Sequence, residues 1–174
     1  SQPFAALLGA YEAQLELGLA SLGGKASLSG TFNEIDVPPP LVSFAVDVAS
    51  VQDIITPELK AAGKRLVLLT VKRDGDLLPD YEDLKAQYRA LTEDIKAKRV
   101  LSAYVLERHG AAEAVAKMAF GNGLGVKLDD SVTEETLFAP GWCNLLLEVK
   151  ADAVEALSCR TERFGEVTAE PVLS

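Results

Sequence analysis

The sequence predicts an α+β fold in which helices pack on a layered, mixed β-sheet. Short apolar runs with strand character, such as LVLLTV (66–71) and NLLLEV (144–149), alternate with stretches of helical periodicity. The order of these elements is irregular and does not follow a strict βαβ repeat. With 174 residues, 48% of them hydrophobic and 25% charged, the chain is long enough for one substantial core.

The first expected element is an amphipathic helix over residues 3–21. Its apolar residues recur near helical spacing: Phe4, Leu7, Leu8, Tyr11, Leu15 and Leu22. Gly23 and Gly24 end the helix, because glycine adopts left-handed backbone at little cost. The prolines at 38–40 cannot continue a helix or a central strand. The run LVSFAVDV (41–48) that follows them has the β-branched composition of a buried strand.

The remaining elements mix strands and helices. Thr56 as a cap and Pro57 in the first turn predict a short helix that ends at Gly63. The further expected strands span residues 66–71, 100–106, 124–128, 144–149 and 165–170. The further expected helices span residues 81–98, 111–120 and 151–158.

Charge and hydropathy restrict the class of partner. The formal net charge is −9, which argues against broad contact with nucleic acid, since that affinity comes from clustered Lys and Arg. No apolar run approaches the roughly 18 to 20 residues that a membrane span requires. The N-terminus also lacks the pattern of a signal peptide. We therefore expect a cytoplasmic protein whose partners are small molecules or other proteins, with no membrane and no nucleic acid.

The polar stretch GGKASLSGTFNEIDVPPP (23–40) raises the question of phosphate binding. It is not a Walker A loop, because that loop follows a strand and opens a helix, whereas this stretch follows a helix. Phosphate can be held by other means: amides beside Gly24 can form an anion nest, Lys25 supplies charge, and Ser27 and Ser29 supply hydroxyl donors. The alternative is a solvated helix-to-strand loop whose glycines only cap the helix.

Two further places carry polar side chains that could meet a ligand. Asn33, Glu34 and Asp36 lie close to the glycine-lysine-serine loop, and their oxygens suit magnesium if they converge; taken singly, they are typical surface turn residues. His109 stands before Gly110 at the start of a helix. A single histidine without a nucleophile or acid partner indicates a structural residue, or at most a pocket wall.

Three other features are interpreted as structural. Cys143 and Cys159 fit neither a redox pair nor a zinc site, so we expect structural thiols. GNGLG (121–125) follows a helix rather than opening one, which indicates a helix C-cap and a turn instead of a dinucleotide site. Trp142 is expected to be a packing anchor beside the 144–149 strand.

Three segments in order resemble one enzyme family. They are ELGLASLGGKASLSGTFNEIDVPPPLVSFAVDV, ITPELKAAGKRLVLL and SAYVLERHGAAEAVAKMAFGNGLGV. They are similar to the C-terminal part of the second synthetase half of the long, single-chain phosphoribosylformylglycinamidine synthase, and GGK-x-S followed by DVPP-x-LVSFAV is fairly specific to that family. The resemblance implies that residues 1–35 form the tail of an AIR-synthase-like N-terminal domain and residues 36–174 the matching C-terminal domain.

The family resemblance implies an ATP-dependent amidation in purine synthesis, which converts formylglycinamide ribonucleotide and glutamine to formylglycinamidine ribonucleotide. ATP and magnesium are the implied cofactors. The implied partners are a nucleotide substrate, and the glutaminase and N-terminal synthetase domains of the same chain. A chain that begins midway through this pattern is expected to be a fragment that is inactive alone. The apolar face of its first helix is then expected to cause self-association.

The sequence departs from the family at two carboxylate positions. Ala26 stands where relatives usually have Asp, and VLERHG (105–110) stands where many relatives have Asp-x-Ser-Asp-Gly-Gly. Glu34 and Glu107 are the substitutes that could hold magnesium. The phosphate-binding residues are expected to be Gly24, Lys25, Ser27 and Ser29, and the pocket wall Asn33, His109 and Gly110. The alternatives are a degenerate, non-catalytic scaffold half and a related ATP-dependent kinase or synthetase.

Overall fold

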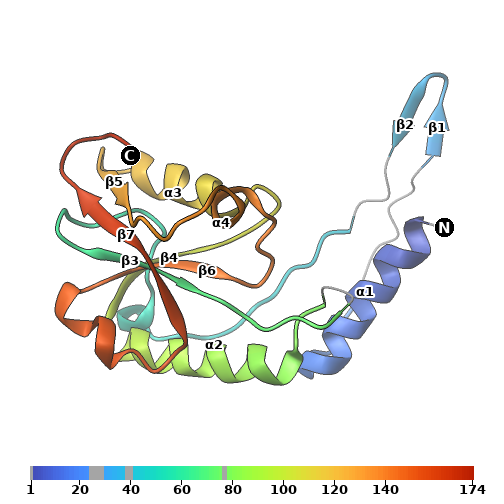
Figure 1. The fold of residues 1–174 in the computed structure, drawn as a ribbon. Helices are drawn as coiled ribbons and strands as arrows, with labels where there is room; N and C mark the ends of the chain where they lie inside the picture. Colours follow the sequence, from blue (N-terminus) through green and yellow to red (C-terminus); the bar gives the residue numbers. More distant parts are fainter. Residues whose placement is uncertain (1, 24–29, 38–40, 76–77) are drawn as a thin grey trace. The chain divides into compact units, whose positions relative to one another are not determined.

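The computed structural model describes residues 2–23, 30–37, 41–75 and 78–174 (Figure 1). The chain divides into two compact units, Ser1–Val48 and Ala49–Ser174. The second unit holds the five-stranded sheet and the helices that pack on it. Within the described ranges, no helix is long and apolar enough to cross a membrane.

The first unit contains a helix and a small hairpin. Helix α1 spans Gln2–Leu17, which confirms most of the helix expected over 3–21. Strands β1 (Gly30–Phe32) and β2 (Ile35–Val37) pair antiparallel, a hairpin that the sequence did not reveal. None of the described residues of this unit is buried. The unit therefore has no apolar core of its own among the residues that the structure describes.

The strand expected over 41–48 is wrong. Residues 41–48 belong to no strand or helix, and their large apolar side chains are exposed, with Phe44 at 91% and Val46 at 98%. An isolated strand leaves its backbone groups without ladder hydrogen bonds. No neighbouring strand pairs with this segment among the described residues. The segment has the apolar composition of a strand, but a strand also requires a partner.

The second unit is built on one sheet of five strands: β3 (Arg65–Leu69), β4 (Val100–Val105), β5 (Gly125–Leu128), β6 (Leu145–Val149) and β7 (Thr161–Thr168). Their order across the sheet is β4-β6-β3-β7-β5, and each of these pairs is antiparallel. Parallel pairing is found in isolated bridges, such as Thr56 with Ser102. The expected α+β class is confirmed.

Helices cover both faces of this sheet (Figure 1). Helix α2 (Tyr81–Lys96) lies on one face, and α3 (Gly110–Phe120) with the short α4 (Glu134–Phe138) lies on the other. Successive residues of β3 alternate between the two cores: Leu66 and Leu68 pack on the α3 side, whereas Val67 and Leu69 pack on the α2 side. Two short 3-10 helices, η1 (Val51–Asp53) and η2 (Ala151–Ala156), complete the unit.

The helix expected from Thr56 to Gly63 is wrong, because its backbone groups bond elsewhere. The Leu59 amide donates to the Met118 carbonyl at 2.9 Å, and the Asn122 side chain donates to the Leu59 carbonyl at 2.7 Å. The Leu59 side chain is fully buried in the α3-side core. Tertiary bonds and this one apolar anchor outweigh the helix-start signals of the sequence.

A buried carboxylate holds the same segment on the sheet. Glu148 of β6 is completely buried and accepts the backbone amides of Lys60 (2.9 and 3.0 Å) and Ala61 (3.3 Å). It also accepts the hydroxyl of the buried Ser102, on the neighbouring strand β4, at 2.9 Å. A buried charge is stable only when several donors satisfy it, and here three residues supply them.

Glu148→Gln should destabilise the second unit by about 3 kcal/mol, because an amide group cannot accept the same donors on both atoms and loses the charge. The control is Glu166→Gln, which removes a half-exposed partner of Arg65 and should cost about 0.5 kcal/mol. Urea unfolding followed by circular dichroism measures both. Equal effects of the two substitutions would mean that the buried carboxylate is not a main stabilising contact.

The exposed apolar face of α1 should make the chain self-associate. Leu8 and Leu15 are more than half exposed on this helix, and such surface is normally covered by a partner. Sedimentation velocity over a wide range of concentration should show association that Leu8→Glu with Leu15→Glu removes. Phe120→Glu, at a still more exposed apolar position of α3, is the control. A wild-type chain that stays monomeric throughout would contradict this expectation.

Candidate functional site

The loop between β4 and α3 carries the predicted site residues of the second unit. Leu106 is buried at its start, Glu107, Arg108 and His109 are exposed, and Gly110 is buried where α3 begins. The Glu107 carbonyl accepts the Gly110 amide at 3.2 Å and the Gly141 amide at 3.1 Å. The loop is thus fixed by its main chain, while the Glu107 carboxylate faces solvent.

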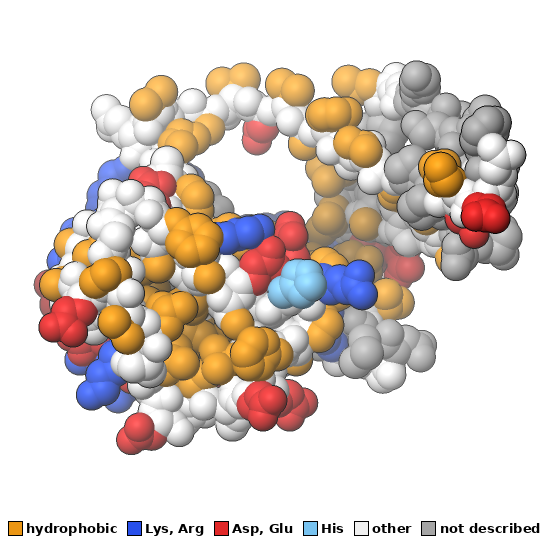
Figure 2. Space-filling view, turned by 90° about the horizontal axis from the view of Figure 1, so that it is seen from above, with side chains coloured by type: hydrophobic (Ala, Val, Ile, Leu, Met, Phe, Trp, Pro, Cys, Tyr) orange, Lys and Arg blue, Asp and Glu red, His pale blue; other side chains and the backbone are white. Residues whose placement is uncertain are grey.

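His109 occupies the N-cap position of α3 but makes no capping hydrogen bond with its side chain. The Glu113 carboxylate pairs with the Lys117 ammonium group at 2.6 Å and also faces the backbone amide of His109. The Lys117 hydrogen bond, with smaller help from His109, holds the pKa of Glu113 below its usual value. Lys117 also lies 5.5 Å from the ring centroid of Tyr104. Figure 2 shows the single histidine at the surface between basic and acidic side chains.

Close packing against α4 requires a glycine at position 110. Its φ is +66°, and an added Cβ would lie 2.5 Å from the Ala139 carbonyl oxygen and 2.6 Å from that of Leu137. These carbonyls belong to the C-terminal end of α4. The glycine therefore allows α4 to pack against the start of α3. This packing places the first turn of α3 next to the polar segment around α4.

A cleft of about 280 Å³ lies beside this loop. Its polar wall includes Thr133, Thr136, Asn144 and two carboxylates, Glu135 and Glu162, and no Lys or Arg is among its described lining residues. The Thr133 side chain caps α4 by accepting a hydrogen bond from the Thr136 amide. The side-chain oxygen of Asn144 accepts a hydrogen bond from the Val71 amide. This wall suits hydrogen-bond donors or cations, but its charge opposes a phosphate group.

The structure describes only part of the predicted phosphate loop and its neighbours. Gly24, Lys25, Ser27 and Ser29 lie outside the described residues. Asn33 and Glu34 form the exposed turn of the β1–β2 hairpin, where Asn33 has a φ of +54°. Asparagine tolerates this conformation, so the turn accounts for that residue. Glu107, His109 and Gly110 share one loop of the second unit.

The described residues form no ready-made metal cluster. Over the described ranges, no group of three or more His, Cys, Asp or Glu side chains is close enough to hold a metal ion. Magnesium usually needs carboxylates combined with water and substrate oxygens. Glu34 and Glu107 are each a single exposed carboxylate.

The cysteines behave as structural thiols. Both are free, and both pack in or against the α2-side core. Burial, with the adjacent Asp94 carboxylate, raises the pKa of Cys159 to about 12, so that thiol stays protonated at neutral pH.

Trp142 is half exposed, which is less burial than a packing anchor requires. The turn after α3 confirms the structural interpretation of GNGLG.

The sequence reasoning missed the residues of α4 and its cleft. Thr133, followed by two acidic residues and then Leu137 and Phe138, is a usable helix-start signal. Helix α4 has only five residues, too few to show a helical period in the sequence. Nothing in the sequence indicated that Glu135 and Glu162 would line the same cleft, because they lie on α4 and β7.

No family model matches this sequence. Among solved structures, Thermotoga maritima PurL complexed with ATP aligns with a TM-score of 0.60 and 16% identity, over 71% of this chain and 24% of that chain. Phosphoribosylformylglycinamidine synthase II from the same organism gives 0.58 and 17%, over 68% and 24%. The hydrogenase maturation protein HypE of E. coli gives 0.53 and 16%, over 69% and 48%.

The chain has the fold shared by PurL and HypE. This finding confirms the family resemblance of the sequence at the level of fold. The chain spans about a quarter of the length of the PurL structures that it matches. Activity, substrates and partners of those longer proteins are thus not carried over by the fold alone.

Gly110→Ala should destabilise the unit by about 3 kcal/mol, because the methyl group meets two backbone carbonyls in addition to the cost of left-handed backbone. The matched control is Gly123→Ala, where φ is +61° and nothing lies within 4 Å of an added Cβ. That control should cost only about 1 kcal/mol. Urea unfolding measures the difference. If Gly110→Ala costs no more than Gly123→Ala, α4 does not pack on the start of α3 as described.

Proposed function

We propose that this chain provides part of an ATP-dependent synthetase of purine biosynthesis. The observation that carries the proposal is the PurL fold of the chain, since one of its structural neighbours is a PurL complexed with ATP. The sequence resemblance supports the finer assignment, an amidation of formylglycinamide ribonucleotide with glutamine as the amide donor. This amidation belongs, in our proposal, to a larger protein with a glutaminase domain and an N-terminal synthetase domain.

The phosphate contact is proposed to come from the glycine-rich loop. Lys25 would supply positive charge, Ser27 and Ser29 would donate hydroxyl hydrogen bonds, and the amides beside Gly24 would complete the nest. ATP would supply the phosphoryl group that activates the amide oxygen. The role of the chain's own residues is to bind and orient phosphate. The assignment of residues 1–35 and 36–174 to AIR-synthase-like N- and C-terminal domains is part of the same proposal.

A second candidate is a degenerate half that serves as a scaffold. One observation favours it: the cleft beside the β4–α3 loop carries Glu135 and Glu162 on its wall and no Lys or Arg among the described lining residues. Carboxylates repel the phosphates of a nucleotide unless a cation lies between them. In this candidate the chain packs against active domains and binds no nucleotide.

Equilibrium dialysis of the 174-residue chain with Mg-ATP separates the two candidates. The synthetase proposal expects ATP binding that Lys25→Ala weakens about tenfold, because a charge-assisted bond to phosphate is lost. Lys150→Ala removes an exposed lysine from the start of η2 and should leave binding unchanged. Binding that is equal in wild type and Lys25→Ala would contradict the proposed phosphate loop. No binding at all would favour the scaffold.

A further inference from the structure

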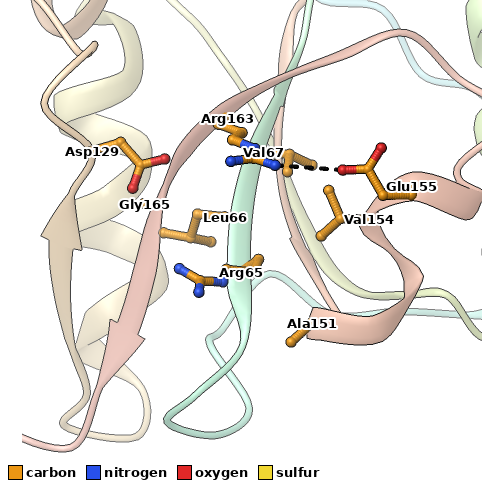
Figure 3. A pocket seen from close by; sticks show the side chains of 9 residues that line it. All are labelled: Arg65, Leu66, Val67, Asp129, Ala151, Val154, Glu155, Arg163 and Gly165. Atoms are coloured by element: carbon orange, nitrogen blue, oxygen red, sulfur yellow. Dashed lines mark hydrogen bonds and ion pairs between the residues drawn. The ribbon is translucent and has the colours of Figure 1, made fainter.

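A second cleft of about 270 Å³ lies on the α2 side of the sheet (Figure 3). Strands β3 and β7 supply Arg65, Val67, Arg163 and Gly165, and η2 supplies the opposite wall with Val154. Val67 and Val154 both belong to the α2-side core. The cleft therefore combines an apolar wall with charged groups at its edges, and its volume is at the small end for ligand sites.

Two arginines reach this cleft from neighbouring strands. Arg163 lies opposite Val67 in the β3–β7 register, and Arg65 lies opposite Glu166. Arg65 pairs with Glu166 at 2.8 Å. Arg163 makes a weaker pair with Glu155 at 3.5 Å, and the two side chains are 76% and 88% exposed. Such an exposed pair contributes little, so an incoming anion can replace Glu155 as the partner of Arg163.

A carboxylate without a partner lines the other side of the cleft. Asp129 follows β5 and is half-buried, and no hydrogen bond or ion pair reaches its side chain from the residues that the structure describes. Figure 3 shows Asp129 and Glu155 on opposite sides of the two arginines. A half-buried carboxylate is best satisfied by a cationic or hydrogen-bond-donating group.

We propose that this cleft binds a small zwitterion of the α-amino-acid type with an aliphatic side chain. The ligand carboxylate pairs with Arg163, whose planar guanidinium group suits carboxylate geometry, while Arg65 keeps its pair with Glu166 and adds positive charge at the edge of the cleft. The ligand ammonium pairs with Asp129, and the aliphatic side chain rests on Val67 and Val154. The site is on the face of the sheet opposite the α3 side, and it stands independently of the proposed ATP chemistry.

The test is an NMR titration of the full chain with L-leucine, followed at the backbone amides of residues 65, 129, 163 and 165. Two analogues each lack one charge: 4-methylpentanoate lacks the ammonium and 3-methylbutylamine lacks the carboxylate. L-Leucine should bind at least about tenfold more tightly than either analogue, because both charges are recognised. No shift at these amides at the solubility limit of leucine would overturn the proposal.

Variants assign the two charge contacts. Arg163→Gln and Asp129→Asn should each weaken leucine binding about fivefold or more. Lys127→Gln removes an exposed cation from the adjacent strand β5, outside the cleft, and should change nothing. Circular dichroism melts confirm that each variant is folded. Unchanged affinity in Asp129→Asn, equal affinity for 4-methylpentanoate, or an equal loss in Lys127→Gln would each contradict the zwitterion site.

Discussion

The Glu148 carboxylate is the contact on which the second unit depends. Its oxygens are completely buried beside β6, where only close donors make a carboxylate tolerable. The amides of Lys60 and Ala61 and the hydroxyl of Ser102 supply those donors. This arrangement fixes an irregular segment against strands β4 and β6 and delivers the Leu59 side chain to the α3-side core.

The Leu59 segment then determines where α3 ends. The Leu59 amide donates a hydrogen bond to the Met118 carbonyl, and the Leu59 carbonyl accepts one from the Asn122 side chain. Both hydrogen bonds lie at the C-terminal end of α3. The N-terminal end is placed by Gly110, which lets the last carbonyls of α4 approach closely. With both ends fixed, the β4–α3 loop has a defined position beside the acidic cleft. Packing requirements, rather than a ligand, explain the residues at both ends of α3.

The elements that the sequence predicted best are those with unambiguous burial. Strands β3 and β6 bury both faces and so appear as continuous apolar runs, and α2 shows a clear helical period. The apolar run at 41–48 has the same local composition without a pairing partner, so composition alone misled. The Thr56–Pro57 signal failed because tertiary bonds to Leu59 are not visible in local sequence.

The candidate site was predictable only in part. The sequence located Glu107, His109 and Gly110 at the start of a helix, and the structure puts them in that loop. It could not reveal that Gly110 is required by α4, since the rest of α3 and all of β5 separate the two in the chain. The buried role of Glu148 was equally invisible, because the sequence of β6 does not identify donors that come from residues 60, 61 and 102.

Native-state amide hydrogen exchange tests the central role of Glu148 most directly. Lys60 and Ala61 lie outside any helix or strand, so ordinary loop amides at these positions would exchange rapidly. If the carboxylate binds them as described, both should exchange as slowly as the amides of β3 and β6, through global unfolding of the unit. Fast exchange of Lys60 and Ala61, with β3 and β6 still protected, would contradict the account.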